Sequence, residues 1–189
     1  MMGFFIFFLI FLLIFDERHR IVANVDYRYG SGRTYSGPRI GDKELLANFG
    51  VNLQGILVSG RPYTAQVTPL ELGGATTAGS INGSRKPWNL TLNLRVDKAI
   101  QLKEGWAVNV YARVSNLLDR KNVINVYPAS GSPTDDGFLV SSNGLDKLEN
   151  INNSDREVEA YLASFQWSLL NPDFFSLPRR IYVGAIFDL

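Results

Sequence analysis

The segment Ile181-Tyr182-Val183-Gly184-Ala185-Ile186-Phe187-Asp188-Leu189 carries an apolar side chain at every second position. The residues of this stripe are Ile181, Val183, Ala185, Phe187 and Leu189. Successive side chains of a β-strand point to opposite faces, so the spacing predicts a strand over residues 180–189 with one apolar face.

Four earlier segments alternate in the same way, at residues 21–29, 46–58, 88–97 and 106–115. The alternation is cleanest in 88–97, where one face is entirely apolar and the other entirely polar. The apolar side is Trp88, Leu90, Leu92, Leu94 and Val96, and the polar side is Asn89, Thr91, Asn93, Arg95 and Asp97. A short turn at 103–105 leads into the next strand, so these two strands are expected to form a hairpin.

Composition narrows the functional classes. The chain has no cysteine, which excludes disulfides, thiolate catalysis and cysteine-ligated metal centres, and its single histidine is His19. A formal net charge of +1 over 189 residues gives no electrostatic reason to expect a nucleic-acid partner. Aromatic residues make up 12% of the chain, and such side chains pack well on sheets. A mainly β chain is therefore expected.

The connections between the predicted strands differ in length. Residues 60–87 and 116–180 are long connections, whereas 99–105 is tight. Long and short connections therefore alternate along the chain, which places the long ones at one end of the strands.

One helix is expected inside the second long connection, over residues 155–170. Ser154 and Glu157 form a capping-box pattern before it, and Asn171-Pro172 ends it. Apolar residues recur at helical spacing at Val158, Tyr161, Leu162, Phe165 and Leu169. This stripe is expected to pack on the loops or on the rim of the strands.

The amino-terminal region differs from the rest. Residues 4–15 form an uninterrupted apolar run, which is shorter than the roughly 20 residues of a membrane-spanning helix. No Lys or Arg precedes the run and Asp16-Glu17-Arg18 follows it, unlike a secretory signal. Residues 1–15 are therefore expected to be separate from 16–189, as a signal-like segment, an anchor or an artefact of a misjoined start.

Seven short motifs occur in a characteristic order. They are Phe15-Asp16-Glu17-Arg18-His19-Arg20-Ile21, Asn48-Phe49-Gly50-Val51-Asn52-Leu53, Ser59-Gly60-Arg61-Pro62-Tyr63, Ile81-Asn82-Gly83-Ser84-Arg85-Lys86-Pro87-Trp88, Ser115-Asn116-Leu117-Leu118-Asp119, Asn125-Val126-Tyr127-Pro128-Ala129-Ser130-Gly131-Ser132-Pro133 with Asp136-Gly137, and Leu177-Pro178-Arg179-Arg180-Ile181. This series resembles the carboxyl-terminal barrel of TonB-dependent outer-membrane receptors, in particular those with an amino-terminal carboxypeptidase-regulatory-like domain.

The resemblance implies a fold class and a place in a larger protein. It implies an antiparallel meander forming the last strands of a transmembrane β-barrel, with one short helix in a long loop, so that residues 16–189 are a partial barrel. Whole receptors of this kind have about 22 strands and a plug. Five strands cannot close such a barrel, because these barrels use even numbers from about eight upward. The chain is therefore expected to be a fragment that does not transport alone.

The resemblance also implies partners and a location. The stripe from Ile181 to Leu189 resembles an outer-membrane insertion signal, although it ends in Leu189 where the usual signal ends in Phe. The implied location is the cell outer membrane, in contact with lipid, with the remainder of a receptor barrel and with a plug. The TonB complex would act only through that missing plug, during uptake of a nutrient that the sequence does not identify.

Candidate sites are few. Polar residues at alternate strand positions are expected to face the barrel lumen, namely Asn93, Arg95, Asn109 and Arg113. His19 has no second histidine or cysteine with which to form a transition-metal site. Asp135-Asp136-Gly137 lacks the ligand spacing of a calcium loop and is expected to form a turn. No catalytic, cofactor or metal site is predicted, and the chain is not expected to be an enzyme.

A second interpretation fits the same alternation. In a soluble exported β-sandwich or small barrel acting as a binding module, the apolar stripes would face a protein core and the polar faces would meet water. The terminal stripe, the alternation of long and short connections and the ordered motifs favour the receptor segment.

Overall fold

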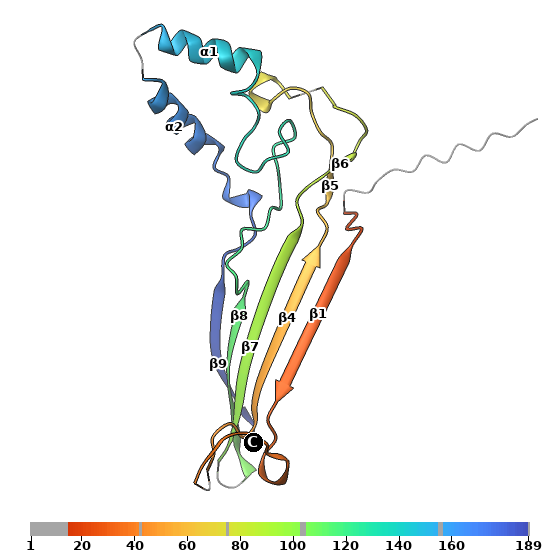
Figure 1. Cartoon of the computed structure of the whole chain (residues 1–189), viewed down its shortest axis with the longest axis vertical. Helices are drawn as coiled ribbons and strands as arrows, with labels where there is room; N and C mark the ends of the chain where they lie inside the picture. The colour runs from red at the N-terminus through yellow and green to blue at the C-terminus, as the bar shows by residue number, and fades with distance from the viewer. Residues whose placement is uncertain (1–14, 42, 75, 103–104, 155–156, 189) are drawn as a thin grey trace, which may run out of the picture. The chain divides into compact units, whose positions relative to one another are not determined.

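The computed structural model describes residues 15–41, 43–74, 76–102, 105–154 and 157–188 (Figure 1). The apolar run at 4–15 lies outside these residues except for Phe15. The chain forms two compact units. One comprises residues 1–18, 59–88 and 123–176, and is here called the loop unit; the other comprises 19–58, 89–122 and 177–189, and is called the sheet unit.

The sheet unit is an antiparallel meander of five strands. The strands, in the order in which they lie side by side, are β1 (Arg20–Arg28), β4 (Phe49–Val58), β7 (Asn89–Gln101), β8 (Ala107–Ser115) and β9 (Arg180–Asp188) (Figure 1). All five predicted strands are confirmed, as is the mainly β, antiparallel class. Strand β7 continues to Gln101, beyond the predicted end at 97, because the hairpin ladder pairs its last residue with Ala107.

The register of the ladders defines two faces, because directly paired residues of an antiparallel sheet share a side. On one, here called the apolar face, two central rows read Val25, Leu53, Leu94, Val114, Ile181 and Tyr27, Val51, Val96, Ala112, Val183. In the described strands every residue on this face is apolar, aromatic or glycine except Lys98. The Lys98 ammonium reaches the end of the sheet and donates to the Leu45 carbonyl at 2.6 Å.

The alternate residues form the opposite side, here called the polar face. Its central rows read Arg28, Gly50, Asp97, Tyr111, Gly184 and Asp26, Asn52, Arg95, Arg113, Tyr182. The polar side chains of the five strands therefore gather on one face, which also carries a few apolar residues, among them Val22, Ile56, Val58 and Ile186. Among the described strands β1 and β9 form its edges and do not pair with each other.

Two connections close one end of the sheet. Residues 102–106 join β7 to β8, with the Leu102 amide donating to the Trp106 carbonyl at 2.8 Å and Gly105 at φ 84°. The connection from β1 to β4 holds η1 (Gly32–Thr34) and a small ladder of β2 (Arg39–Ile40) with β3 (Lys43–Glu44). The chain leaves the other end of the sheet after Val58 and after Ser115, so the two long connections start from the same end, as predicted.

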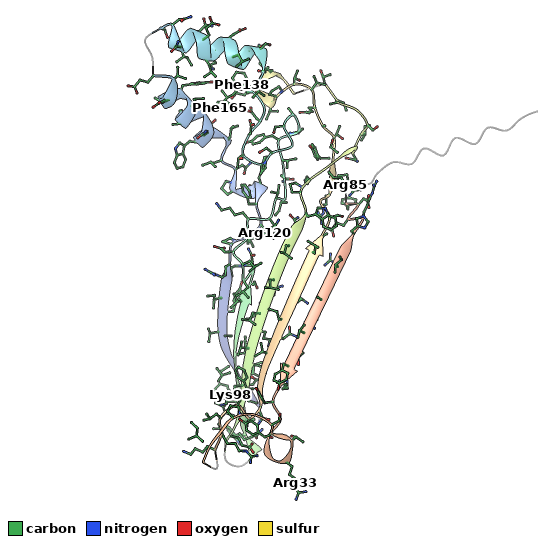
Figure 2. All side chains as sticks on the ribbon, viewed as in Figure 1. Arg33, Arg85, Lys98, Arg120, Phe138 and Phe165 are labelled. Carbon is green, nitrogen blue, oxygen red and sulfur yellow. The ribbon has the colours of Figure 1, made fainter. Side chains whose placement is uncertain are left out.

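The loop unit contains two helices and a short ladder. Its elements are β5 (Pro62–Tyr63) paired with β6 (Ser84–Arg85), η2 (Leu70–Leu72), α1 (Ser142–Asn152), α2 (Val158–Leu169) and η4 (Pro172–Phe174). A small apolar core is built on Phe138, Phe165 and Leu169, and the two phenylalanine rings lie 5.7 Å apart (Figure 2). The predicted packing of the α2 stripe on loop residues is confirmed, since Phe138 lies in a loop.

The helix prediction needs two corrections. Helix α1 was not expected, because its sequence contains Gly144 and several polar residues; its amino terminus is capped by the Ser141 hydroxyl, which accepts from the Gly144 amide at 3.1 Å. The capping box was wrong: the residue before α2 is Glu157, without a side-chain cap, and the Ser154 hydroxyl donates to the Ile151 carbonyl at the end of α1. In the described part of the chain, neither helix has the length and apolar character needed to cross a bilayer.

Candidate functional site on the polar face

The four residues predicted to line a lumen lie on the polar face. Arg95 and Arg113 are direct partners across β7 and β8, and Asn109 pairs with Ala99 further along the same ladder. Asn93 pairs with Gln54 on the other side of β7. The structure thus brings the four together on one surface, and their orientation toward a lumen stays a prediction.

A half-buried ion pair connects β1 to β7 across β4 on this face. Asp97 is only 4% exposed, and the Arg28 guanidinium reaches it across β4 with 2.9 Å and 3.3 Å hydrogen bonds to its two carboxylate oxygens. Gly50 lies between them in the row, and a Cβ at that position would come within 2.8 Å of the Arg28 Cζ. The side chain of Arg28 can cross β4 because position 50 has none.

Two other arginines lie over tyrosine rings. The Arg95 Cζ lies 5.1 Å from the centre of the Tyr111 ring, and the Arg113 Cζ lies 5.0 Å from that of Tyr182. Both contacts are cation–π interactions, which are stronger where water is excluded. The Tyr111 ring extends toward β9 over Gly184, where an added Cβ would lie 2.7 Å from the ring.

Amide side chains link the neighbouring rows. The Asn52 amide donates to Asn24 at 3.1 Å and to Asp26 at 3.2 Å, and the Asn93 amide donates to Gln54 at 3.3 Å. The surface forms a depression of about 290 Å³ between these amides and the side chains of Arg95 and Arg113. Its lining residues are Asn52, Gln54, Asn93, Leu94, Arg95, Arg113 and Ser115.

Two asparagines that were not among the predicted lumen residues bond backbone groups beside the sheet. Asn122 is 4% exposed, and its amide bonds the backbone N–H and C=O of Leu90, both at 2.9 Å, as a neighbouring strand would. Asn116, at φ 54°, donates to the carbonyls of Arg120 and Leu177. The only sequence signal for this turn was the motif that begins at Ser115, because neither asparagine follows the strand alternation.

The loop unit holds a second polar cluster, built by three of the quoted motifs. Arg85 donates to the Asp16 carboxylate and to the Gly60 carbonyl, and a Cβ on Gly60 would lie 1.7 Å from the Lys86 carbonyl oxygen. The hydrogen bond from Arg85 holds the pKa of Asp16 below its usual value. Burial lowers the pKa of Lys86, whose ammonium donates to the Ile124 carbonyl at 2.7 Å. These contacts bring the motifs at 59–63 and 81–88 together in space.

The residues of the predicted insertion signal share the apolar face of β9. Ile181, Val183, Ala185 and Phe187 are all exposed, with Val183 at 75%, whereas Leu189 lies outside the described residues. Their role in insertion stays a prediction.

The segment Asp135-Asp136-Gly137 uses its carboxylates to bond nearby backbone amides. The Asp135 carboxylate accepts from the Gly137 amide at 2.8 Å, and Asp136, 2% exposed, accepts from the Phe138 amide at 3.0 Å, so the segment forms the predicted turn. Burial raises the pKa of the neighbouring Tyr127, whose hydroxyl donates to the Leu169 carbonyl. Within the described ranges, no group of three or more potential metal ligands occurs.

No protein-family model, curated protein or solved structure matches this chain.

Proposed function

We propose that this chain is a wall segment of a transmembrane β-barrel, at the carboxyl-terminal end of a TonB-dependent outer-membrane receptor for nutrient uptake. The observation that carries the proposal is the apolar face, which continues across five strands and is interrupted only by Lys98. A lipid-facing barrel wall requires such a face, because alternate residues of every strand contact hydrocarbon.

The exposure of this face supports lipid as its neighbour. On the edge strands β1 and β9, Val25 is 63% and Ile181 66% exposed, and the apolar residues of β4 on this face are half-buried. Each apolar Å² removed from water is worth about 25 cal/mol, so a large sheet face of this kind is strongly driven to a nonaqueous environment. Scattered exposed apolar residues are ordinary in soluble proteins, but a contiguous face is typical of an interface or a membrane.

Aromatic residues gather at one end of the apolar face. Tyr27 lies one residue before the end of β1, Phe49 begins β4 and Phe187 lies one residue before the end of β9, all at the end where the β7–β8 turn also carries Trp106. Outer-membrane barrels carry aromatic girdles where their walls meet the two membrane–water interfaces. The position of this band supports a membrane interface at the short-turn end.

The lengths of the five strands fit a barrel wall. The strands have 9, 10, 13, 9 and 9 residues, close to the roughly 9–11 residues of a tilted spanning strand. An open sheet edge in lipid leaves N–H and C=O groups unpaired, at a cost of several kcal/mol each, so the edges β1 and β9 require further strands. We therefore place the chain in a larger receptor, without transport by the segment alone.

A matched pair of substitutions tests the proposal. Leu53→Arg puts a charge on the apolar face in the middle of β4, and Gln54→Arg puts the same charge on the polar face one residue later. An arginine facing the middle of a bilayer costs about 2–4 kcal/mol. In a vesicle flotation assay of the refolded full chain, we expect Leu53→Arg to weaken membrane association strongly and Gln54→Arg to leave it near the wild-type level.

The opposite outcome supports the soluble binding module. If the wild-type chain, expressed with an export signal, is recovered as a soluble, monomeric, β-rich protein, the receptor proposal fails. Equal loss of flotation in both variants would also count against a lipid-facing apolar side.

A further inference from the structure

Arg95 and Arg113 form a like-charged pair in the centre of the polar face. They are direct register partners across β7 and β8, which places their Cβ atoms about 4.5–5.5 Å apart. Like charges placed directly opposite each other destabilise a sheet unless a negative group compensates them. A local conflict of this kind is a reason to look for a ligand.

The carboxylates of the sheet supply only part of that compensation. Asp97 forms an ion pair with Arg95, whose Nε lies 3.6 Å from one carboxylate oxygen, but both oxygens of Asp97 are already bonded by Arg28. Asp26 lies beyond Asn52 in the row and accepts a hydrogen bond from it. Among the described side chains of β8 and β9, none on the polar face is acidic, so Arg113 has no carboxylate beside it there.

A tyrosine ring lies beside each guanidinium group. The Arg95 Cζ lies over the Tyr111 ring and the Arg113 Cζ lies over the Tyr182 ring, at 5.1 Å and 5.0 Å from the ring centres. The N–H groups of guanidinium point outward in its plane, where they match the paired oxygens of carboxylate or phosphate. Two such groups border one depression of about 290 Å³.

Uncharged donors line the same depression. The Gln54 side chain accepts from Asn93 through its oxygen, and within the described residues its NH₂ group has no hydrogen-bond acceptor. The Ser115 hydroxyl, which also lines the depression, has no hydrogen-bond partner in that part of the chain. Both can donate to an anion held between the arginines.

We propose that Arg95 and Arg113, assisted by Gln54 and Ser115, bind a small oxyanion from solution, a carboxylate or a phosphate. The site follows from the register of the sheet and does not depend on whether the apolar face meets lipid. The oxyanion site could therefore exist even if the receptor proposal fails. The receptor proposal could equally hold if no oxyanion binds.

The test is anion-dependent stability of the full chain refolded in detergent micelles. Sodium chloride is replaced at constant ionic strength by inorganic phosphate in one series and by acetate in another, and thermal unfolding is followed by far-UV circular dichroism. We expect a saturable rise in the unfolding midpoint, because a ligand that binds only the folded state stabilises it. A rise with only one of the two anions shows whether the site prefers phosphate or carboxylate. A rise with phosphate, with acetate or with both supports the site.

Two variants and one control separate the site from a general salt effect. Arg113→Gln is expected to weaken binding by about tenfold or more, since it removes a charge-assisted hydrogen bond. Arg33→Gln makes the same charge change in η1, away from the strands, and is expected to keep the response (Figure 2). Arg113→Glu is expected to raise the midpoint in chloride, by turning the like-charged pair into an opposite pair, and to abolish the response.

Equilibrium dialysis against labelled phosphate and acetate gives a readout independent of unfolding. The proposal is overturned if the wild-type chain binds neither anion, or if Arg33→Gln lowers binding as much as Arg113→Gln does. It is also overturned if Arg113→Glu retains wild-type binding.

Discussion

At the scale of single residues, glycine and asparagine set the geometry of the polar face. Gly50 leaves room for Arg28 to reach Asp97, and Gly184 leaves room for the Tyr111 ring. Asn122 pairs with the backbone of Leu90 through its side chain. The two glycines act because they have no side chain, and Asn122 acts because its amide bonds like a backbone peptide. The alternation of apolar and polar residues does not reveal either role.

The Arg28–Asp97 pair gives a prediction at this scale. Arg28→Met keeps the length of the side chain and removes its charge, so Asp97 is left buried without its bidentate partner. Because Arg28 is itself half exposed, we expect a loss of about 1–3 kcal/mol in the free energy of unfolding. Urea titration of the refolded chain in micelles measures the change.

Arg33→Met is the matched control for this substitution. Arg33 is exposed in η1, and its replacement should change the unfolding free energy by less than about 0.5 kcal/mol. Equal effects of the two substitutions would show that the pair with Asp97 does not stabilise the sheet.

At the scale of elements, the motifs at 59–63 and 81–88 become one structure, the β5–β6 ladder. The Lys86 amide donates to the Arg61 carbonyl at 3.0 Å, and the backbone passes so close to Gly60 that a larger residue would collide with it. Arg85, which is labelled in Figure 2, donates a hydrogen bond from this ladder to the Asp16 carboxylate. The Asp16–Arg85 contact ties the start of the described chain to this ladder.

This contact is expected to be pH-dependent. The pKa of Asp16 is lowered in the folded state, first by the Arg85 hydrogen bond and further by Arg18. The stabilisation is therefore fully present above the unfolded-state pKa of about 3.9 and is lost as the pH falls through the lower, folded value. Carbon-13 NMR of the Asp16 carboxyl group measures that pKa directly.

Arg85→Gln should raise the pKa of Asp16 toward its ordinary value. Arg61→Gln is the control, because Arg61 pairs with Glu17 at 3.0 Å. An unchanged pKa of Asp16 in Arg85→Gln would show that Arg85 is not its principal partner.

At the scale of the whole molecule, the number of strands restricts how the sheet can be closed. Four successive antiparallel pairings make β1 and β9 run in the same direction. A ring of identical copies joined from β9 to β1 would contain parallel seams, whereas outer-membrane barrels are antiparallel throughout. Closure therefore requires a different segment with an odd number of strands.

Cysteine cross-linking tests this restriction without background, because the chain has no cysteine. We expect no disulfide between Val25→Cys in one copy and Val183→Cys in another after vesicle insertion. Ala112→Cys and Val183→Cys in one chain are register partners, near enough for a disulfide, and should cross-link. A high yield between copies from the first pair would show that copies close through a parallel seam.

The spacing of apolar residues was enough to predict the five strands, their two faces and helix α2, because period-two and helical spacings are local properties of the chain. That spacing did not predict that Arg95 lies opposite Arg113, that Arg28 reaches Asp97 across a glycine, or that Asn122 pairs with Leu90. These contacts depend on strand register, and register is fixed by pairing between residues far apart in the chain, such as Arg28 and Asp97, 69 positions apart. Alternation assigns a residue to a face, and pairing decides its neighbours there.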